Sequence, residues 1–277
     1  MGWKGITRSL CGTRHQQQGL PCQDFGAQWI GGDVVVGAIA DGAGSAKYAD
    51  LGAKLAVTTL VDYLKASDQW LHSHQASWTT LPPAALAGTT RKCFTKGIKA
   101  VQATLQQQAQ KRGGTVDDFA CTLLAFLATP QWIAALQIGD GFMVIRSDDS
   151  SSSPTSIPSR SNNGPYRLLF EADKGEYANQ TTFVTSSTVM DTLQTQVVMA
   201  SPTFICASTD GLESVAIRQR DAFPFPPFFQ PLEEYMTETP VPEQDDEYIM
   251  AFLQSERLNQ RTDDDKTLLM CQYTYDQ

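Results

Sequence analysis

The stretch "VVVGAIADGAGSAKYADLGAKLAV", residues 34–57, passes from an apolar run through a glycine-rich turn into a helical pattern. Residues 33–40 are mostly β-branched or small and apolar, which predicts a buried strand. From Lys47 to Ala66 the apolar residues recur at spacings of three and four, so they share one face of a helix. A buried strand, the dipeptide Asp41-Gly42 and a buried helix therefore follow one another directly.

The remainder of the chain separates its helices from its strands. A second long helix is predicted over residues 84–112, where Gly113-Gly114 ends the pattern. A consecutive pair of helices followed by a series of strands favours an antiparallel α+β protein built in layers. Further strands are predicted at 119–128, 131–138, 142–146, 203–208 and 267–273, with weaker patterns at 3–10, 24–30, 166–171 and 192–199.

Composition limits the partners of the protein. The 277 residues include 21 Lys and Arg against 30 Asp and Glu, a net charge of −9, and no basic patch is evident. Such a chain repels nucleic acids and anionic membranes. The six cysteines are scattered without a CxxC pair, which favours reduced thiols. No signal peptide or apolar run of about 18 residues is visible, so a cytoplasmic protein is expected.

Two segments interrupt the regular patterns. Residues 148–165 are polar and rich in serine and proline, which predicts a mobile surface loop. Residues 218–247 combine prolines with aromatic residues, and we interpret them as an irregular segment. No repeat of solenoid length is present, and a single domain over residues 1–277 is expected.

The dipeptide Asp-Gly ends an apolar strand three times, at Asp41, Asp140 and Asp210. Asp-Gly is a favoured hairpin turn and needs no function to explain it. A hairpin requires a second strand directly after the turn, and the strand "FMVIR" meets this requirement after Asp140. Helical patterns follow Asp41 and Asp210 instead, so a hairpin explains these two positions poorly.

Further carboxylates stand beside other strands. Asp263-Asp264-Asp265 leads into the last predicted strand, and Asp24 begins a weak one. Such an acidic run is usually a solvated turn, although strand alternation turns Asp264 away from both neighbours. Carboxylates gathered in low dielectric lose their charge unless cations neutralise them. Convergence of these strand ends would therefore predict a site for Mg²⁺ or Mn²⁺, and a pair of ions can promote phosphate hydrolysis.

Other kinds of site find little support in the sequence. "GAGSAK" after a strand lacks the third glycine of a dinucleotide loop, because Lys47 stands there, and no phosphate-loop GK[ST] is present. His72 and His74 are interpreted as exposed residues of a polar linker between helices. A nucleophilic triad is not supported, since GxSxG is absent and the chain has only three histidines.

Six motifs together resemble the metal-dependent protein phosphatases of the 2C type, especially a bacterial branch. The resemblance covers nearly the whole chain and implies a four-layer α-β-β-α sandwich of two antiparallel sheets flanked by helix pairs. It also implies a two-metal site at one end of the sandwich. The motifs are "GTRHQQQGLPCQDF", "AIADGAGSAKYADLGAKLA", "CTLLAFLATPQWIAALQIGDG", "KGEYANQTTF", "ICASTDGLES" and "DDDKTLLM".

The resemblance also implies roles for the acidic residues. Asp41 would bridge two metal ions, and the Gly42 carbonyl would bind the first of them. Asp210 and Asp264 would hold the second ion, and Asp24 would hydrogen-bond a metal-bound water. Asp140, with Asp210, would bind a weaker third ion, while its reading as a plain hairpin turn stays open.

The chain departs from the family pattern in two places. Many relatives have a histidine soon after the first Asp-Gly, as general acid for the leaving group, but residues 43–46 here are Ala, Gly, Ser and Ala. That role would then be vacant, or Lys47 or water would fill it. The family's phosphate-binding arginine lies a few residues before the first acidic motif, whereas Arg14 and His15 lie ten and nine residues before Asp24. Either of these two could bind phosphate.

These inferences predict a Mg²⁺- or Mn²⁺-dependent phosphatase acting on phosphoserine or phosphothreonine in proteins. A metal-activated hydroxide would attack phosphorus directly, and the enzyme would be a monomer that serves bacterial signalling with a cognate serine/threonine kinase. The alternative is a non-catalytic phosphoprotein-binding or scaffold module that retains the fold. A plain metal-stabilised β protein is a third reading.

Overall fold

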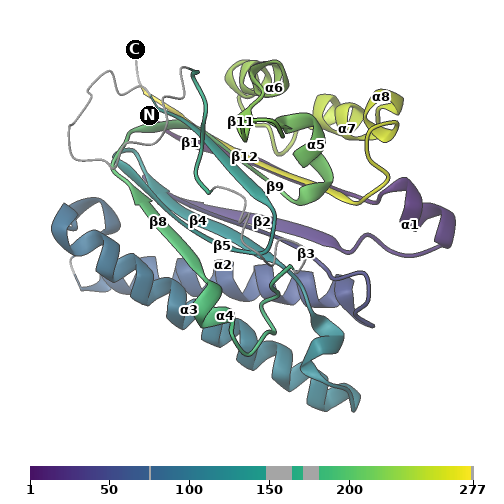
Figure 1. The fold of residues 1–277 in the computed structure, drawn as a ribbon. Coiled ribbons are helices and arrows are strands. Elements are labelled where there is room, and N and C mark those ends of the chain that lie inside the picture. The colour runs from purple at the N-terminus through teal and green to yellow at the C-terminus, as the bar shows by residue number, and fades with distance from the viewer. Residues whose placement is uncertain (75, 148–163, 171–180, 276–277) are drawn as a thin grey trace.

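The computed structural model describes residues 1–74, 76–147, 164–170 and 181–275, and these form a layered sandwich. Two antiparallel sheets pack face to face, and helices cover the outer face of each sheet (Figure 1). This arrangement confirms the predicted α+β fold with α-β-β-α layers. On one side of the molecule the cover consists of two long helices, α2 (Ala49–Ser73) and α3 (Pro83–Arg112), which pack against each other.

Among the described residues, each main sheet contains five strands. The first has the order β1-β12-β9-β6-β7 and the second the order β2-β3-β4-β5-β8. The strands of the first sheet are β1 (Gly2–Leu10), β12 (Lys266–Thr274), β9 (Pro202–Ser208), β6 (Phe142–Ser147) and β7 (Arg167–Leu168). Those of the second are β2 (Asp24–Gly31), β3 (Val34–Asp41), β4 (Leu123–Thr129), β5 (Trp132–Ile138) and β8 (Gln194–Val198).

Helices cover both sheets. The second sheet is covered by α2 (Ala49–Ser73) and α3 (Pro83–Arg112). The first is covered by α5 (Glu213–Ala216), α6 (Pro226–Glu238), α7 (Glu247–Gln254) and α8 (Glu256–Asn259). The remaining short elements are α1 (Thr13–Gln18), α4 (Val189–Thr192), the pair β10 (Ile217–Arg218) and β11 (Phe223–Pro224), and three 3₁₀ turns, η1 (Trp78–Thr80), η2 (Val116–Phe119) and η3 (Asp210–Leu212).

Three apolar cores lie between the four layers, and β3 shows why its sequence is apolar throughout. Val36 and Ala38 pack in the core beneath α2 and α3, whereas Val35 and Ile39 pack in the core between the sheets. Successive side chains of a strand point to opposite faces, so a strand covered on both faces needs apolar residues at every position. The continuous apolar run at residues 34–40 follows from this burial on both faces.

The turn at Asp140 is not a hairpin, which corrects the reading left open for it. β5 belongs to the second sheet and β6 to the first, so residues 139–141 carry the chain from one sheet to the other. Gly139 has φ +97°, a value that favours glycine. None of the three Asp-Gly dipeptides therefore joins two paired strands.

Three other boundaries differ from the sequence prediction. Residues 116–119 form η2, and the strand predicted from residue 119 begins at Leu123. α2 continues to Ser73, so His72 lies in its last turn rather than in a linker. The segment 218–247 contains α6, whose buried residues Phe228, Phe229, Leu232, Tyr235 and Met236 have helical spacing.

The prolines concealed α6 in the sequence. Pro226 and Pro227 occupy its first two positions, where a missing N–H costs no helical hydrogen bond. Most of the predicted mobile loop, residues 148–163, lies outside the described residues. Within the part of the chain that the structure describes, no helix has both the length and the apolar character needed to span a membrane.

Candidate active site

Asp24 and Asp41 lie opposite each other at one end of the second sheet. They are the first residue of β2 and the last of β3, and they are cross-strand partners in the antiparallel ladder. The Asp41 N–H donates to Thr122 Oγ1 over 2.9 Å, and the Thr122 N–H donates to the Asp41 carbonyl over 2.8 Å. Asp41 is therefore held at the sheet edge through its backbone, which leaves its carboxylate free for other partners.

The opposing sheet contributes Asp210 and Asp264. Asp210 follows β9 at the start of η3, and Asp264 precedes β12, the neighbour of β9. A Cβ atom at Gly211 would collide with the carbonyl oxygen of Asp265. Glycine at 211 thus allows the two backbones to approach closely and brings the acid before it toward Asp264.

Asp265 has a separate role that the sequence did not reveal. Its side chain is buried, with the residue 3% exposed, and it accepts hydrogen bonds from the Gly12 N–H at 2.6 Å and the Gln23 N–H at 2.5 Å. The His15 Nδ1 atom lies 2.9 Å from Asp265 Oδ2. These contacts tie the segments before α1 and before β2 to the start of β12.

Arg14 and His15 occupy different environments although they are adjacent in α1. His15 is buried and its ring contacts Asp265. Arg14 is 46% exposed at its side chain and donates to Asp264 Oδ1 over 2.9 Å. Only the arginine presents its charged group at the surface of the acidic site.

Partial or full burial and neighbouring charges oppose the ionisation of Asp24, Asp41 and Asp210. Burial, together with the charges of Asp24, Asp210 and Asp264, raises the pKa of Asp41 to about 10. Burial raises the pKa of Asp24 to about 7, and a hydrogen bond from Thr209 opposes this shift. Burial and the charges of Asp140 and Asp264 raise the pKa of Asp210 to about 7. The charges that act between Asp41 and the acids of both sheets are those expected where strand ends converge.

Three polar residues of the site escaped the sequence analysis. Thr209 Oγ1 donates to Asp24 Oδ2 over 2.7 Å and accepts from the Thr267 N–H over 3.1 Å. Burial and the charge of Asp140 raise the pKa of Glu213. Glu213 lies three residues after Asp210, and its place in the first turn after this acid was the signal that could have indicated it.

The remaining predicted residues, Asp140, Gly42 and Lys47, have the following contacts. Thr181 Oγ1 donates to Asp140 Oδ2 over 2.9 Å. A Cβ atom at Gly42 would lie 2.6 Å from the carbonyl oxygen of Ala49, so packing against the start of α2 already requires glycine there. Lys47 is exposed, with its Nζ atom 5.1 Å from the centre of the Tyr48 ring.

The donor set fits hard divalent cations. The side chains of Asp24, Asp41, Asp210 and Asp264 offer carboxylate oxygens, which are the metal ligands that Mg²⁺ and Mn²⁺ prefer. Bound cations would also offset the repulsion that, together with burial, raises the pKa of three of these carboxyls. Among the described residues no three Asp, Glu, His or Cys side chains are arranged to hold one ion together. Mg²⁺ does not require three protein ligands, because it keeps several waters and is usually bound by one or two carboxylates.

Two concave regions of the structure lie away from these carboxylates. One, of about 350 Å³, is next to the turn between β2 and β3, and the other, of about 640 Å³, follows the edges of β1 and β2. Neither is lined by any of the acids described above. We take the acidic cluster as the candidate site because acids from the strand ends of both sheets meet there, and carboxylates with perturbed pKa values are common at functional sites.

Comparisons with known proteins show the family of the chain. The chain is 28% identical over 277 residues to serine/threonine-protein phosphatase 3 of Escherichia coli (strain K12), covering 98% of each protein. Its fold is similar to serine/threonine phosphatase Stp1 from Staphylococcus aureus, at TM-score 0.59 and 13% identity, with 99% of this chain and 96% of that one covered.

A second solved structure contains metal. The catalytic domain of the serine threonine protein phosphatase PstP, in complex with two manganese ions, matches at TM-score 0.56 and 16% identity, with 98% of each chain covered. A family model described as protein phosphatase 2C matches residues 11–253. With its two-sheet sandwich and its carboxylates at the strand ends, the chain belongs to the protein phosphatase 2C family.

Proposed function

We propose that this phosphatase hydrolyses phosphoserine and phosphothreonine in proteins, using two divalent cations, Mg²⁺ or Mn²⁺. The observation that carries the proposal is the cluster of Asp24, Asp41, Asp210 and Asp264, in which burial and neighbouring charges raise the pKa of the first three carboxyls. Such a cluster is unfavourable without cations and suits them when they are present. Membership of the family and the named relatives support the same activity.

Different carboxylates would bind the two ions. Asp41 interacts with acids from both sheets, so we assign it to both ions, with the Gly42 carbonyl on the first and with Asp210 and Asp264 on the second. Asp140 and Asp210 would form a third, weaker site. Bound there, the ions would act as Lewis acids toward phosphate and lower the pKa of water.

The surrounding residues orient the reactants. Thr209 fixes the carboxylate of Asp24, which we assign to hydrogen-bond the attacking water. Arg14 lies at the exposed rim and can donate two parallel hydrogen bonds to a phosphoryl group, which makes it a better candidate than the buried His15. A proton for the leaving alkoxide would come from Lys47 or from water.

A metal-dependent assay tests this function. Purified protein with Mn²⁺ should release phosphate from a panel of phosphothreonine peptides, and a chelator should abolish the activity. Asp41→Ala and Asp210→Ala should each lose at least about 100-fold in kcat/KM, because several kcal/mol of transition-state stabilisation depend on the ions. The exposed Asp191 provides a control, since Asp191→Ala should keep full activity. Full activity in Asp210→Ala would show that the assigned site is wrong.

A second candidate is a phosphoprotein-binding module without turnover. The observation that favours it is the stretch Ala43-Gly44-Ser45-Ala46, which lacks a side chain able to protonate the leaving group. Calorimetry with a phosphothreonine peptide distinguishes the two, since this module would bind the peptide with Mn²⁺ and leave it intact. In either case the partners would be phosphoproteins made by a serine/threonine kinase.

A further inference from the structure

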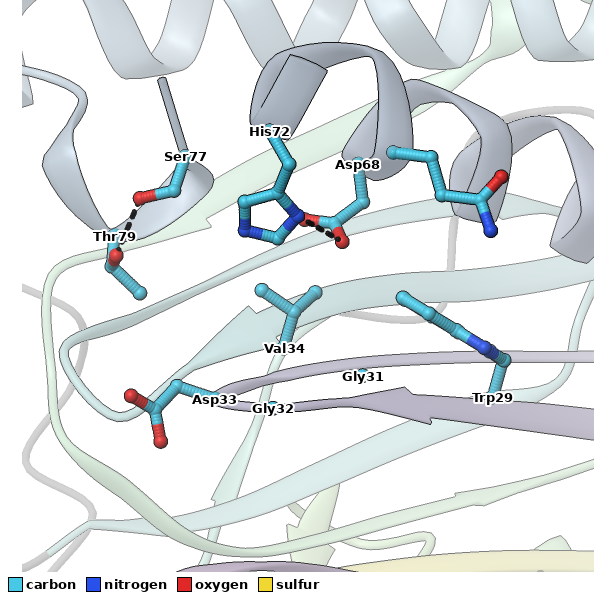
Figure 2. Close-up of a pocket in the computed structure, with 10 residues that line it drawn as sticks. Trp29, Gly31, Gly32, Asp33, Val34, Asp68, His72, Ser77 and Thr79 are labelled. Carbon is cyan, nitrogen blue, oxygen red and sulfur yellow. Dashed lines mark hydrogen bonds and ion pairs between the residues drawn. The ribbon is translucent and has the colours of Figure 1, made fainter. Parts of the chain in front are cut away.

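A pocket of about 350 Å³ lies at the opposite end of β2 and β3 from the acidic cluster. Figure 2 shows Asp68 and His72 on α2 facing the turn between β2 and β3, with Trp29 on one side and Ser77 and Thr79 on the other. Because β2 begins at Asp24 and ends at Gly31, the two sites are separated by the length of the strand. The pocket therefore stands apart from the phosphatase chemistry.

Asp68 is the unusual residue of this pocket. It is 2% exposed, and within the described chain its buried Oδ1 atom has no hydrogen-bond partner. Its Oδ2 atom lies 3.3 Å from His72 Nδ1, and the His72 side chain is 56% exposed. Burial raises the pKa of the Asp68 carboxyl, and the charge of His72 opposes this shift. One oxygen of this buried carboxylate lacks a hydrogen-bond partner, and the partner of the other oxygen is exposed and can be displaced. The carboxylate can therefore accept hydrogen bonds from another donor.

The other walls favour a positively charged ligand. Asp33 adds a second carboxylate, of which Oδ1 accepts a hydrogen bond from the Tyr273 hydroxyl over 3.3 Å. Ser77 Oγ and Thr79 Oγ1, 2.7 Å apart, supply further acceptors, and Trp29 presents an indole. No lysine or arginine is among the described residues that line the pocket. Cations are attracted by negatively charged hydrogen-bond acceptors and by the faces of aromatic rings.

We propose that this pocket binds a guanidinium group, which takes the place of His72 on Asp68 and stacks on Trp29. A guanidinium is planar, weakly hydrated and carries five N–H donors, so it can serve several acceptors at once and pack on an indole. A metal ion would make no use of the indole of Trp29, because an indole N–H is a donor and cannot ligate a cation. The volume falls in the range of small-molecule sites, about 300–1,000 Å³.

Calorimetry with two matched probes tests the charge requirement. Butylguanidinium and butylurea share a stem and a planar head, and they differ in charge and in one group, because urea has an accepting oxygen where guanidinium has a donating NH₂. Full-length protein should bind butylguanidinium at least about tenfold more tightly than butylurea, a difference of 1.4 kcal/mol. Equal affinity for both probes, or binding of neither, would overturn the proposal. No substrate is present in this measurement, so its outcome does not depend on the phosphatase activity.

Variants locate the site. Asp68→Asn keeps the shape of the side chain and removes its charge, so affinity for butylguanidinium should fall at least about tenfold. Asp62→Asn is the matched control, because Asp62 is exposed on the same helix and does not line the pocket. His72→Ala should tighten binding, because it removes the competing partner. Unchanged affinity in Asp68→Asn contradicts the assignment. If Asp68→Asn fails to fold, Trp29→Leu decides the question, and unchanged affinity there has the same meaning.

One further arm identifies where the guanidinium comes from. The peptide acetyl-Gly-Arg-Gly-amide presents the same group on an arginine side chain. Binding of this peptide at least as tight as that of butylguanidinium supports a site for an arginine of a protein partner. Binding of butylguanidinium without the peptide supports a free small molecule.

Discussion

Asp264 and Asp265 are consecutive in the chain but have different surroundings. Asp264 faces the acidic cluster and the exposed Arg14, whereas Asp265 turns into the protein and receives hydrogen bonds from two backbone N–H groups. Strand alternation predicts this divergence, since neighbouring side chains point to opposite sides. What alternation does not predict is the set of donors that the buried carboxylate meets.

The first prediction concerns Asp265→Ala. The change leaves the Gly12 N–H, the Gln23 N–H and His15 without their acceptor in a buried region, and each orphaned donor costs about 1–3 kcal/mol. We expect a loss of about 3 kcal/mol in the free energy of unfolding, measured by urea denaturation. Asp263→Ala, at an exposed neighbour, should change stability by less than about 0.5 kcal/mol. Equal stability of the two variants would contradict the role assigned to Asp265.

At the scale of elements, α2 is placed by contacts that only glycine permits. A Cβ atom at Gly52 would collide with the carbonyl oxygen of Phe119 in η2. The same helix approaches Gly42, directly after Asp41, where a Cβ atom would meet Ala49. Close packing of α2 on η2 and on the end of β3 therefore helps to position the acidic edge of the second sheet.

The second prediction compares two helical glycines. Gly52→Ala should destabilise the protein by about 1–3 kcal/mol, because backbone has to move to accommodate the methyl group. Gly88→Ala, in α3, meets no atom within 4 Å and should stabilise the protein by about 0.5–1 kcal/mol through helix propensity. Thermal denaturation of both variants provides the measurement. Stabilisation by Gly52→Ala would show that α2 is not packed as closely as described.

The third prediction concerns α6. Phe229 is fully buried and its ring lies 5.2 Å from that of Tyr166 and 4.9 Å from that of Phe228, measured between centroids. Phe229→Ala should cost about 3–5 kcal/mol. Phe225, 44% exposed just before the helix, should cost less than about 1 kcal/mol when changed to alanine. A small loss for Phe229→Ala in denaturant unfolding would mean that α6 does not anchor this layer.

For the whole molecule, the acidic cluster makes stability depend on pH and on metal. Asp24 and Asp210 have a pKa of about 7 in the folded state, above the ordinary value of 3.8. Between about pH 4 and pH 7 the folded state therefore holds protons that the unfolded state has released, so stability falls as pH rises. Burial and neighbouring charges give Asp41 a pKa of about 10, which extends this loss to higher pH.

The fourth prediction follows from this fall in stability with rising pH. In a chelator, the melting temperature should be several degrees lower at pH 8 than at pH 5, and Mn²⁺ at 100 times its Kd should restore about 2.7 kcal/mol at pH 8. Asp210→Asn should flatten the dependence on pH and weaken the response to Mn²⁺. Scanning calorimetry measures both effects, and a higher melting temperature at pH 8 than at pH 5 in chelator would refute the account.

The sequence by itself determined most of the long elements and supplied the metal-binding candidates. Periodicity located β3, α2 and α3, and the Asp-Gly ends of strands identified Asp41 and Asp210, because burial and turn chemistry act over a few neighbouring residues. Only the tertiary structure decided that Asp140 connects two sheets, that Asp265 gathers three donors and that Asp68 lines a pocket. Those facts depend on which distant strands pair, and a backbone N–H or carbonyl can pair with any strand that packing brings beside it.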